Sequence, residues 1–320
     1  MVKPSRKGRK LLIRNPPQTS TLKRTGVEGQ GPRNLRGLFH MLEKSRDMPD
    51  GAFRKRPVDA DKYSVGTVAV IGGSTRYPNA PVIAGLGARA AGAGLVSLVV
   101  PEESRMCAAA HLPEATFARF SVPFVPPRAD VFVVGMGLGV SADSEQVVSS
   151  VLSGNCGRFV LDADALTIIA GWSAGPRGFA PVPGQEIIMT PHEGEAARLL
   201  GATRESVKSD RLSAAKVIAT KYGATVVLKG PGTLVVSNDG SRIYVNGTGN
   251  PFMALGGMGD LLAGTMGARW AYLKSDAFTA ACSAVWLHGA ASDRLVAAER
   301  DASILNTAAE IGSLRIHMDR

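Results

Sequence analysis

Residues 246–265 are the stretch of this sequence best suited to chemistry. They lead from a short strand-like run into a long apolar, helix-like run that starts at Leu261. Gly256, Gly257 and Gly259 therefore lie where the chain turns into a helix. Such a turn offers free backbone N–H groups and the positive end of the helix dipole to an anion. The sequence predicts a phosphate-binding turn here.

Asp260 places one carboxylate at the rim of this predicted turn. A carboxylate beside bound phosphate suggests a base that works next to phosphoryl chemistry. The structural alternative is that Asp260 only caps the helix, because aspartate is common at helix starts. The stretch by itself does not decide between these two interpretations.

Two more carboxylates, Asp162 and Asp164, follow an apolar strand predicted at residues 159–161. The carboxyl end of a parallel strand is the side on which α/β sheets bind their ligands. Asp164 has a structural alternative as the cap of a helix at residues 165–170, whereas Asp162 is harder to explain in that way. Asp162 is therefore a candidate binding residue.

His192 and Lys229 follow two further predicted strands, at residues 187–189 and 225–228. A lone histidine is usually structural, but this one lies in a polar loop at the same sheet edge, and we expect it to contact a ligand. Lys229 begins a glycine turn, where it either contacts a nucleotide phosphate or is a solvated turn residue. Spacing alone leaves both interpretations of Lys229 open.

The positive charge of the chain is concentrated near its N-terminus. The formal net charge is +10, yet residues 1–57 hold 15 Lys/Arg and 4 Asp/Glu, which leaves residues 58–320 close to neutral. We expect residues 1–57 to be a basic extension that is poorly ordered or draped over one folded domain at residues 58–320. The near-neutral domain without a stacking motif argues against nucleic-acid binding.

Targeting and redox signals are weak in this chain. The extension lacks the apolar centre of a secretory signal, and no run is read as a membrane span. The cysteines are few, widely separated and odd in number, which fits neither a disulfide framework nor a zinc site. We expect a cytoplasmic protein that contacts neither a membrane nor nucleic acid.

Strand-like and helix-like runs alternate across most of residues 65–300. This pattern predicts an α/β fold with a doubly wound, mainly parallel sheet and helices on both faces. A hairpin predicted at residues 225–236 gives the sheet an antiparallel edge. No glycine loop fits the patterns of a P-loop nucleotidase or a dinucleotide dehydrogenase.

An ordered set of motifs over about residues 58–300 resembles the ADP- or ATP-dependent NAD(P)H-hydrate dehydratases. Each motif is weak alone, whereas the set in this order is specific. The motifs are Gly-Gly-Ser at 72–74 with Tyr-Pro-Asn-Ala-Pro at 77–81, Ala-Ala-Gly-Ala-Gly-Leu-Val at 90–96, Gly-Met-Gly-Leu-Gly at 135–139, Asp-Ala-Asp-Ala-Leu at 162–166, Thr-Pro-His-Glu-Gly-Glu at 190–195, Leu-Lys-Gly at 228–230 with Thr233, and Gly-Asn-Pro at 249–251 through Gly-Gly-Met-Gly-Asp at 256–260.

The resemblance implies a ribokinase-like fold and a repair reaction. The S epimer of NADH or NADPH hydrated at C6 of the nicotinamide ring would be dehydrated at the expense of ADP or ATP. The C6 hydroxyl would first be phosphorylated, and phosphate would leave as the ring nitrogen pushes in its lone pair. Asp260 would take the hydroxyl proton, while the N–H groups of Gly257, Met258 and Gly259 hold the phosphoryl oxygens.

The resemblance also implies which residues bind the two substrates. The hydrated cofactor would be contacted by Ala80, Gly137, Asp162, His192, Asn250 and Asp260. The adenine nucleotide would be contacted by Lys229, Gly230, Pro231, Gly232, Thr233 and Gly259. Mg²⁺ would bridge the nucleotide phosphates, with Glu195 as an outer-sphere partner. Nothing in the sequence decides between ADP and ATP.

The chain departs from the family pattern around Asp260. Phe252 stands where the family usually has glycine, and Leu255 and Met258 stand where it has hydroxyl side chains. A backbone anion site does not need those hydroxyls, but their contacts to phosphate or substrate would be lost. Residues 1–57 are too short and polar to be the family's companion epimerase domain, so we expect a separate epimerase in the same pathway. We also expect a homo-oligomer, with a tetramer as one candidate.

Two other functions stay open at this point. A ribokinase-like vitamin or thiazole kinase would use the same Asp260 and glycine turn but release a phosphorylated product. A catalytically weakened nucleotide-binding protein would account for Leu255 and Met258. The motifs at residues 162–164 and 190–195 favour the dehydratase.

Overall fold

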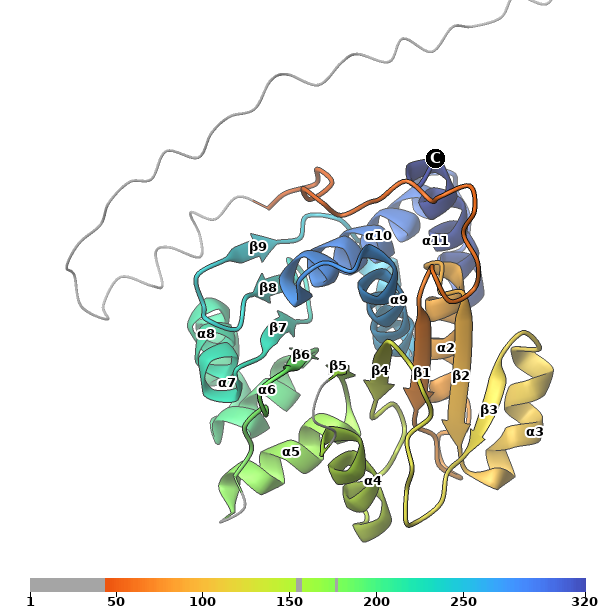
Figure 1. Ribbon diagram of the computed structural model, residues 1–320. Helices are drawn as coiled ribbons and strands as arrows, with labels where there is room; N and C mark the ends of the chain where they lie inside the picture. Colours follow the sequence, from red (N-terminus) through yellow and green to blue (C-terminus); the bar gives the residue numbers. More distant parts are fainter. Residues whose placement is uncertain (1–43, 154–156, 176–177) are drawn as a thin grey trace, which may run out of the picture. The chain divides into compact units, whose positions relative to one another are not determined.

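The computed structural model describes residues 44–153, 157–175 and 178–320, which form a nine-stranded sheet (Figure 1). The first seven strands across the sheet are parallel, and β8 runs antiparallel to both of its neighbours. The order is β3 (Thr116–Arg119), β2 (Leu95–Val100), β1 (Thr67–Ile71), β4 (Val131–Val134), β5 (Gly157–Leu161), β6 (Gln185–Met189), β7 (Thr225–Leu228), β8 (Leu234–Val236) and β9 (Ile243–Val245). The predicted doubly wound architecture with an antiparallel edge is confirmed.

Helices cover both faces of the sheet, as Figure 1 shows. One face packs against α2 (Ala80–Ala90), α3 (Glu102–His111), α9 (Met258–Leu273), α10 (Ala277–Ala297) and α11 (Ile304–Met318). The other packs against α4 (Ala142–Leu152), α5 (Asp164–Ala174), α6 (Glu193–Leu200), α7 (Arg204–Ser209) and α8 (Arg211–Tyr222). Successive side chains of a strand point to opposite faces of the sheet. Along β7, Val227 accordingly enters the core on the α9 face, while Val226 and Leu228 enter the core on the other face.

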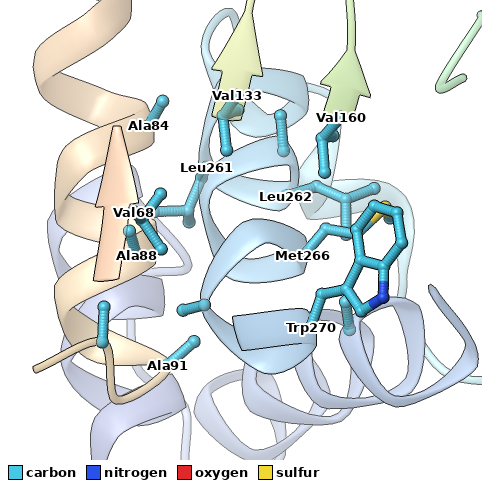
Figure 2. Close-up of a cluster of buried hydrophobic side chains, with 14 of the residues drawn as sticks. Val68, Ala84, Ala88, Ala91, Val133, Val160, Leu261, Leu262, Met266 and Trp270 are labelled. Carbon is cyan, nitrogen blue, oxygen red and sulfur yellow. The ribbon is translucent and has the colours of Figure 1, made fainter. Parts of the chain in front are cut away.

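Helix α9 is the central helix of its face and carries the glycine turn at its N-terminus. Its apolar side packs on β1, β4 and β5, while α2 lies alongside it (Figure 2). The backbones of α2 and α9 approach so closely that a Cβ at Gly264 would overlap the carbonyl oxygen of Ala84. Trp270 is fully buried further along α9. This dense packing holds the first turn of α9 in place, and with it Asp260.

Some elements differ from the sequence predictions. Strand β3 was not predicted, since this edge strand exposes Thr116 and Arg119 at its ends and has little apolar character. The short polar helix α7 and the 3₁₀ turn η1 (Pro251–Met253) were also not predicted. Helix α9 begins at Met258 rather than 261, so the last glycine of the turn and Asp260 already belong to the helix.

The described part of the predicted N-terminal extension, residues 44–57, lies along the folded domain. Ser45 forms a parallel bridge with Asn246 beside the end of β9. The carbonyl oxygen of Ala52 accepts hydrogen bonds from Arg269 (2.9 Å) and Ser283 (2.6 Å) on α9 and α10. Residues 1–43 of the predicted extension lie outside the described residues. In the part of the chain that is described, no helix combines the length and the apolar character that crossing a bilayer requires.

Candidate active site

The loops that follow neighbouring parallel strands meet at the carboxyl edge of the sheet. Hydrogen bonds between their backbones continue the sheet ladder beyond the strands. The N–H of Asp162 donates to the carbonyl of Val134 (3.0 Å), and the N–H of Lys229 donates to that of Pro191 (2.8 Å). The side chains that follow β5, β6 and β7 are therefore held on one rigid edge.

Lys229 lies at the centre of this edge, between two buried carboxylates. Its Nζ is 2.6 Å from Oδ1 of Asp162 and 3.8 Å from Oε2 of Glu195. Burial alone would lower the pKa of Lys229, but the two carboxylates outweigh it and raise that pKa above its ordinary value. Burial also raises the pKa of Glu195, an effect that Lys229 opposes. The ammonium group is thus a fixed positive charge, not a solvated turn residue.

Asp260 lies in the first turn of α9 beside this cluster. Burial, reinforced by the negative charge of Asp162, raises its pKa from 3.8 to about 7, although Lys229 opposes the shift. The N-cap position of α9 is Gly257, so Asp260 is not the capping residue. A carboxyl group that titrates near neutral pH can both accept and release a proton under physiological conditions.

The glycine turn brings backbone N–H groups close to these charges. Gly257 adopts a positive φ of 93°, and a Cβ there would lie 2.8 Å from Cδ1 of Ile83. A Cβ at Gly259 would lie 3.4 Å from Nζ of Lys229 and 3.9 Å from Oδ2 of Asp162, so this glycine leaves its space next to the charged cluster open. First-turn N–H groups have no partner within a helix. The N–H of Met258, however, makes a long 3.3 Å bond to the carbonyl of Leu255.

Asp164 has a structural role that differs from the predicted helix cap. Its Oδ2 accepts a 2.7 Å hydrogen bond from the N–H of Gly139, which ties the loop after β4 to the loop after β5. The N-cap of α5 is Ala163, whose φ of 51° is unusual for a residue with a side chain. Such strained backbone persists only where its surroundings hold it, and here it lies between Asp162 and Asp164.

His192 is the N-cap of α6. Its Nδ1 accepts hydrogen bonds from the N–H groups of Gly194 (2.9 Å) and Glu195 (3.3 Å), while Glu195 in turn accepts one from the N–H of His192 (2.8 Å). Partial burial, together with Lys229, lowers the pKa of His192. The imidazole is therefore neutral and carries its hydrogen on Nε2. Sequence reasoning did not foresee this reciprocal cap, in which Nε2 also lies 3.5 Å from Oε1 of Glu195. A ligand contact of His192 therefore stays a prediction.

Three other residues predicted to bind the substrate, Ala80, Gly137 and Asn250, differ in how they are packed and hydrogen-bonded. Gly137 is packed so closely that a Cβ there would lie 2.6 Å from Cβ of Tyr77 and 3.0 Å from that of Ala80. The structure thus brings Ala80 and Gly137 together. Asn250 uses its amide within the protein: Nδ2 donates to Asp293 (3.0 Å) and Oδ1 accepts from the N–H of Phe252 (3.1 Å).

A cleft of about 660 Å³ opens beside Gly259. All of the residues predicted to contact the nucleotide line it, together with α10 and the loop between β9 and α9. Its lining comprises Lys44, Lys229, Gly230, Pro231, Gly232, Thr233, Asn246, Gly247, Thr248, Gly249, Asn250, Pro251, Met253, Ala254, Met258, Gly259, Leu262, Val285, His288 and Gly289. The contributions of Lys44 and α10 were not predicted, because α10 has the apolar pattern of a core helix.

Arg211, at the start of α8, holds the turn that follows β7 at residues 229–232. Sequence reasoning missed this residue. The buried guanidinium donates to four carbonyl oxygens of the turn. The partners are Leu228 (3.1 Å), Lys229 (3.1 Å), Pro231 (2.8 Å) and Gly232 (3.3 Å). Because these carbonyl oxygens accept hydrogen bonds from Arg211, their negative ends point toward the guanidinium and do not repel an anion in the cleft. A basic residue at the start of an amphipathic helix gives no sequence signal for such a role.

The described residues do not themselves form a metal cage. Within them, no group of three or more His, Cys, Asp or Glu side chains is placed to hold a metal ion. Glu195, the predicted outer-sphere partner, already accepts from the N–H of His192 and lies near Lys229. The donor set therefore does not fit a preformed Mg²⁺ site.

Comparisons with known proteins agree with this geometry. A sequence model of the NAD(P)H-hydrate dehydratase family matches residues 68–312. The ADP-dependent (S)-NAD(P)H-hydrate dehydratase of Neisseria meningitidis serogroup B is 39% identical over 272 residues, which cover 80% of this chain and 88% of that protein. The bifunctional NAD(P)H-hydrate repair enzyme of Gloeobacter violaceus is 38% identical over 253 residues, or 76% of this chain and 47% of that protein.

A solved structure extends the similarity to three dimensions. The ADP/ATP-dependent NAD(P)H-hydrate dehydratase from Bacillus subtilis, co-crystallised with ATP and Mg²⁺, superposes with a TM-score of 0.73 at 27% identity. The superposition covers 83% of this chain and 94% of the Bacillus chain. The fold and most of the sequence thus agree with the same family. The chain belongs to the NAD(P)H-hydrate dehydratase family.

Proposed function

We propose that this protein repairs hydrated nicotinamide cofactors by dehydrating the S epimer of NADHX or NADPHX with ADP or ATP as the phosphoryl donor. The observation that carries the proposal is the placement of Asp260. Its carboxyl group, with a pKa of about 7, stands in the first turn of α9, beside the glycine turn and the Lys229 cluster. The names of the relatives described above support the same reaction.

The chain's own residues suit each step of this reaction. Asp260 would remove the proton of the C6 hydroxyl as that oxygen attacks the terminal phosphoryl group of the nucleotide. The N–H groups of Gly257 and Gly259 would hold the phosphoryl oxygens in transit, with Lys229 nearby as a fixed charge. Expulsion of phosphate, driven by the ring nitrogen, would complete the dehydration. The balanced products with ADP are the reduced cofactor, AMP and phosphate.

The predicted binding residues divide between two neighbouring regions. The nucleotide would occupy the cleft lined by residues 229–233 and Gly259. The hydrated cofactor would lie near Ala80, Gly137, Asp162, His192 and Asn250. Mg²⁺ would enter with the nucleotide phosphates and neutralise their charge, because the donor set of the protein does not hold it alone. We further propose a cytoplasmic homo-oligomer that works with a separate epimerase.

An absorbance assay tests the function. Wild-type protein, supplied with NADHX, Mg²⁺ and either ADP or ATP, should restore the near-ultraviolet absorbance of the reduced nicotinamide. Asp260→Asn should abolish this recovery while still binding nucleotide. If wild type recovers no absorbance with either nucleotide yet binds AMP, the protein is a catalytically weakened nucleotide binder rather than a dehydratase. If a stable phosphorylated product accumulates instead, the protein is a kinase.

A further inference from the structure

His288 is a buried polar residue of the cleft for which the proposed reaction gives no role. It lies on α10, lines the cleft and is 6% exposed. Its Nε2 is closed off from water and has no hydrogen-bond partner among the described residues. Buried polar atoms are nearly always hydrogen-bonded in native proteins. An orphaned one in the wall of a cleft therefore points to a ligand.

The other polar side chains at this end of the cleft are already committed within the protein. Nδ2 of Asn246 donates to the carbonyls of Thr248 (3.1 Å) and Val285 (3.3 Å). The hydroxyl of Thr248 lies 3.1 Å from the carbonyl of Trp286, to which it donates. The hydroxyl of Thr233 donates to the carbonyl of Gly230 (2.9 Å). Among these neutral side chains, His288 is the one whose buried ring nitrogen has no partner among the described residues.

The surroundings of His288 fit a flat aromatic base. Val285, Leu262 and Met253 give the cleft apolar surface. Burial lowers the pKa of His288 to about 4, so its ring is neutral at physiological pH and has one nitrogen that donates and one that accepts. Because Nε2 is unbonded, no hydrogen bond at this atom fixes the ring against turning about its Cβ–Cγ bond.

We propose that His288 recognises the adenine base of the nucleotide by turning its ring, which lines the cleft, so that Nε2 accepts a hydrogen bond from the 6-amino group. The inference rests on the proposed function, in which an adenine nucleotide occupies this cleft. The apolar wall would cover the face of the base, while His288 reads its edge. Gly289 next to it lets the loop before α9 pack against α10, because a Cβ there would overlap the hydroxyl of Thr248. His288 is then a residue that determines base specificity.

Binding of ADP and inosine diphosphate tests this proposal by calorimetry. Inosine has a carbonyl oxygen where adenine has the 6-amino group, so it cannot donate to Nε2. Wild type should bind ADP about tenfold more tightly than inosine diphosphate. His288→Leu should weaken ADP about tenfold and inosine diphosphate less than twofold, which removes the preference. His288→Gln, whose amide oxygen can accept, should retain part of it.

The unfolding temperature of His288→Leu and a control substitution separate a loss of base recognition from a general loss of folding. His288→Leu removes an unpaired buried polar atom, so its unfolding temperature should be unchanged or higher. His317→Leu, on α11 and outside the cleft, should leave both affinities unchanged. If His288→Leu keeps the wild-type preference for ADP, or weakens both ligands equally, His288 is only a packing residue. If wild type binds no adenine nucleotide at all, the proposed function fails first and this inference fails with it.

Discussion

Replacing Asp260 by asparagine should change stability and activity in opposite directions. The pKa of Asp260 in the folded protein is about 7, against 3.8 for the unperturbed group. Between about pH 4 and pH 7 the folded state therefore holds a proton that the unfolded state has lost. Stability falls as the pH rises through this window, and above it the ionised carboxylate opposes folding. Asparagine, which is neutral and similar in shape, removes that cost.

The size of the effect follows from the two pKa values. A tenfold change in proton affinity corresponds to about 1.4 kcal/mol, so the whole difference amounts to about 4 kcal/mol. Asp260 is only partly buried, so solvent screening reduces this figure, and we expect roughly 2 kcal/mol. Asp260→Asn should be more stable than wild type by this amount at about pH 8 and equally stable at about pH 4.

Urea denaturation followed by tryptophan fluorescence at both pH values measures the difference. Asp59→Asn, which changes an exposed loop carboxylate, is the matched control and should show no such pH dependence. In parallel, kcat/KM of wild type should rise with pH to a plateau, with its midpoint near pH 7, whereas Asp260→Asn should have no turnover. A difference in stability that is equal at both pH values would refute the desolvation of Asp260.

Three further variants test the surroundings of this carboxylate. Lys229→Met should lower the free energy of unfolding by about 3 kcal/mol, because it leaves the buried carboxylate of Asp162 unpaired; an unchanged urea midpoint would contradict this. Gly259→Ala should raise KM for the nucleotide about tenfold without changing the unfolding temperature, because the added methyl group would occupy the space proposed for a phosphate. An unchanged KM would show that no phosphate lies there. Arg269→Met should cost about 3 kcal/mol, because it removes the buried hydrogen bonds to Ala52, Ser283 and Asp319, although Asp319 keeps Arg315 as a partner. The kcat of the folded fraction should be unchanged, and a fall in kcat would show that Arg269 also positions the site.

The layered fold could be predicted because it follows from local patterns. Strand β7 is a short apolar run that ends at a glycine turn, and the structure places it at Thr225–Leu228 as predicted. Strand β3 was missed because its pairing with β2, rather than its own composition, makes it a strand. The predicted start of α9 at Leu261 was also wrong, because the helix already begins at Met258, within the turn that contains Gly256, Gly257 and Gly259.

The site was only partly accessible to sequence reasoning. Lys229 and Asp162 were named as candidates, but their 2.6 Å contact joins residues that are far apart in sequence. Arg211 and His288 gave no signal, because their roles arise from four carbonyls of a distant turn and from the absence of a partner for Nε2 among the described residues. Such roles depend on three-dimensional packing, which a pattern of residue types does not encode.

The stoichiometry of a single reaction distinguishes nucleotide-driven dehydration from its alternatives. NADHX incubated with the purified protein, Mg²⁺ and ADP should yield NADH, AMP and inorganic phosphate in equal amounts, quantified together by chromatography. Equal amounts are expected because phosphorylation of the C6 hydroxyl and loss of phosphate belong to one turnover. AMP formed without NADH, or NADH formed without consumption of nucleotide, would contradict the proposed reaction.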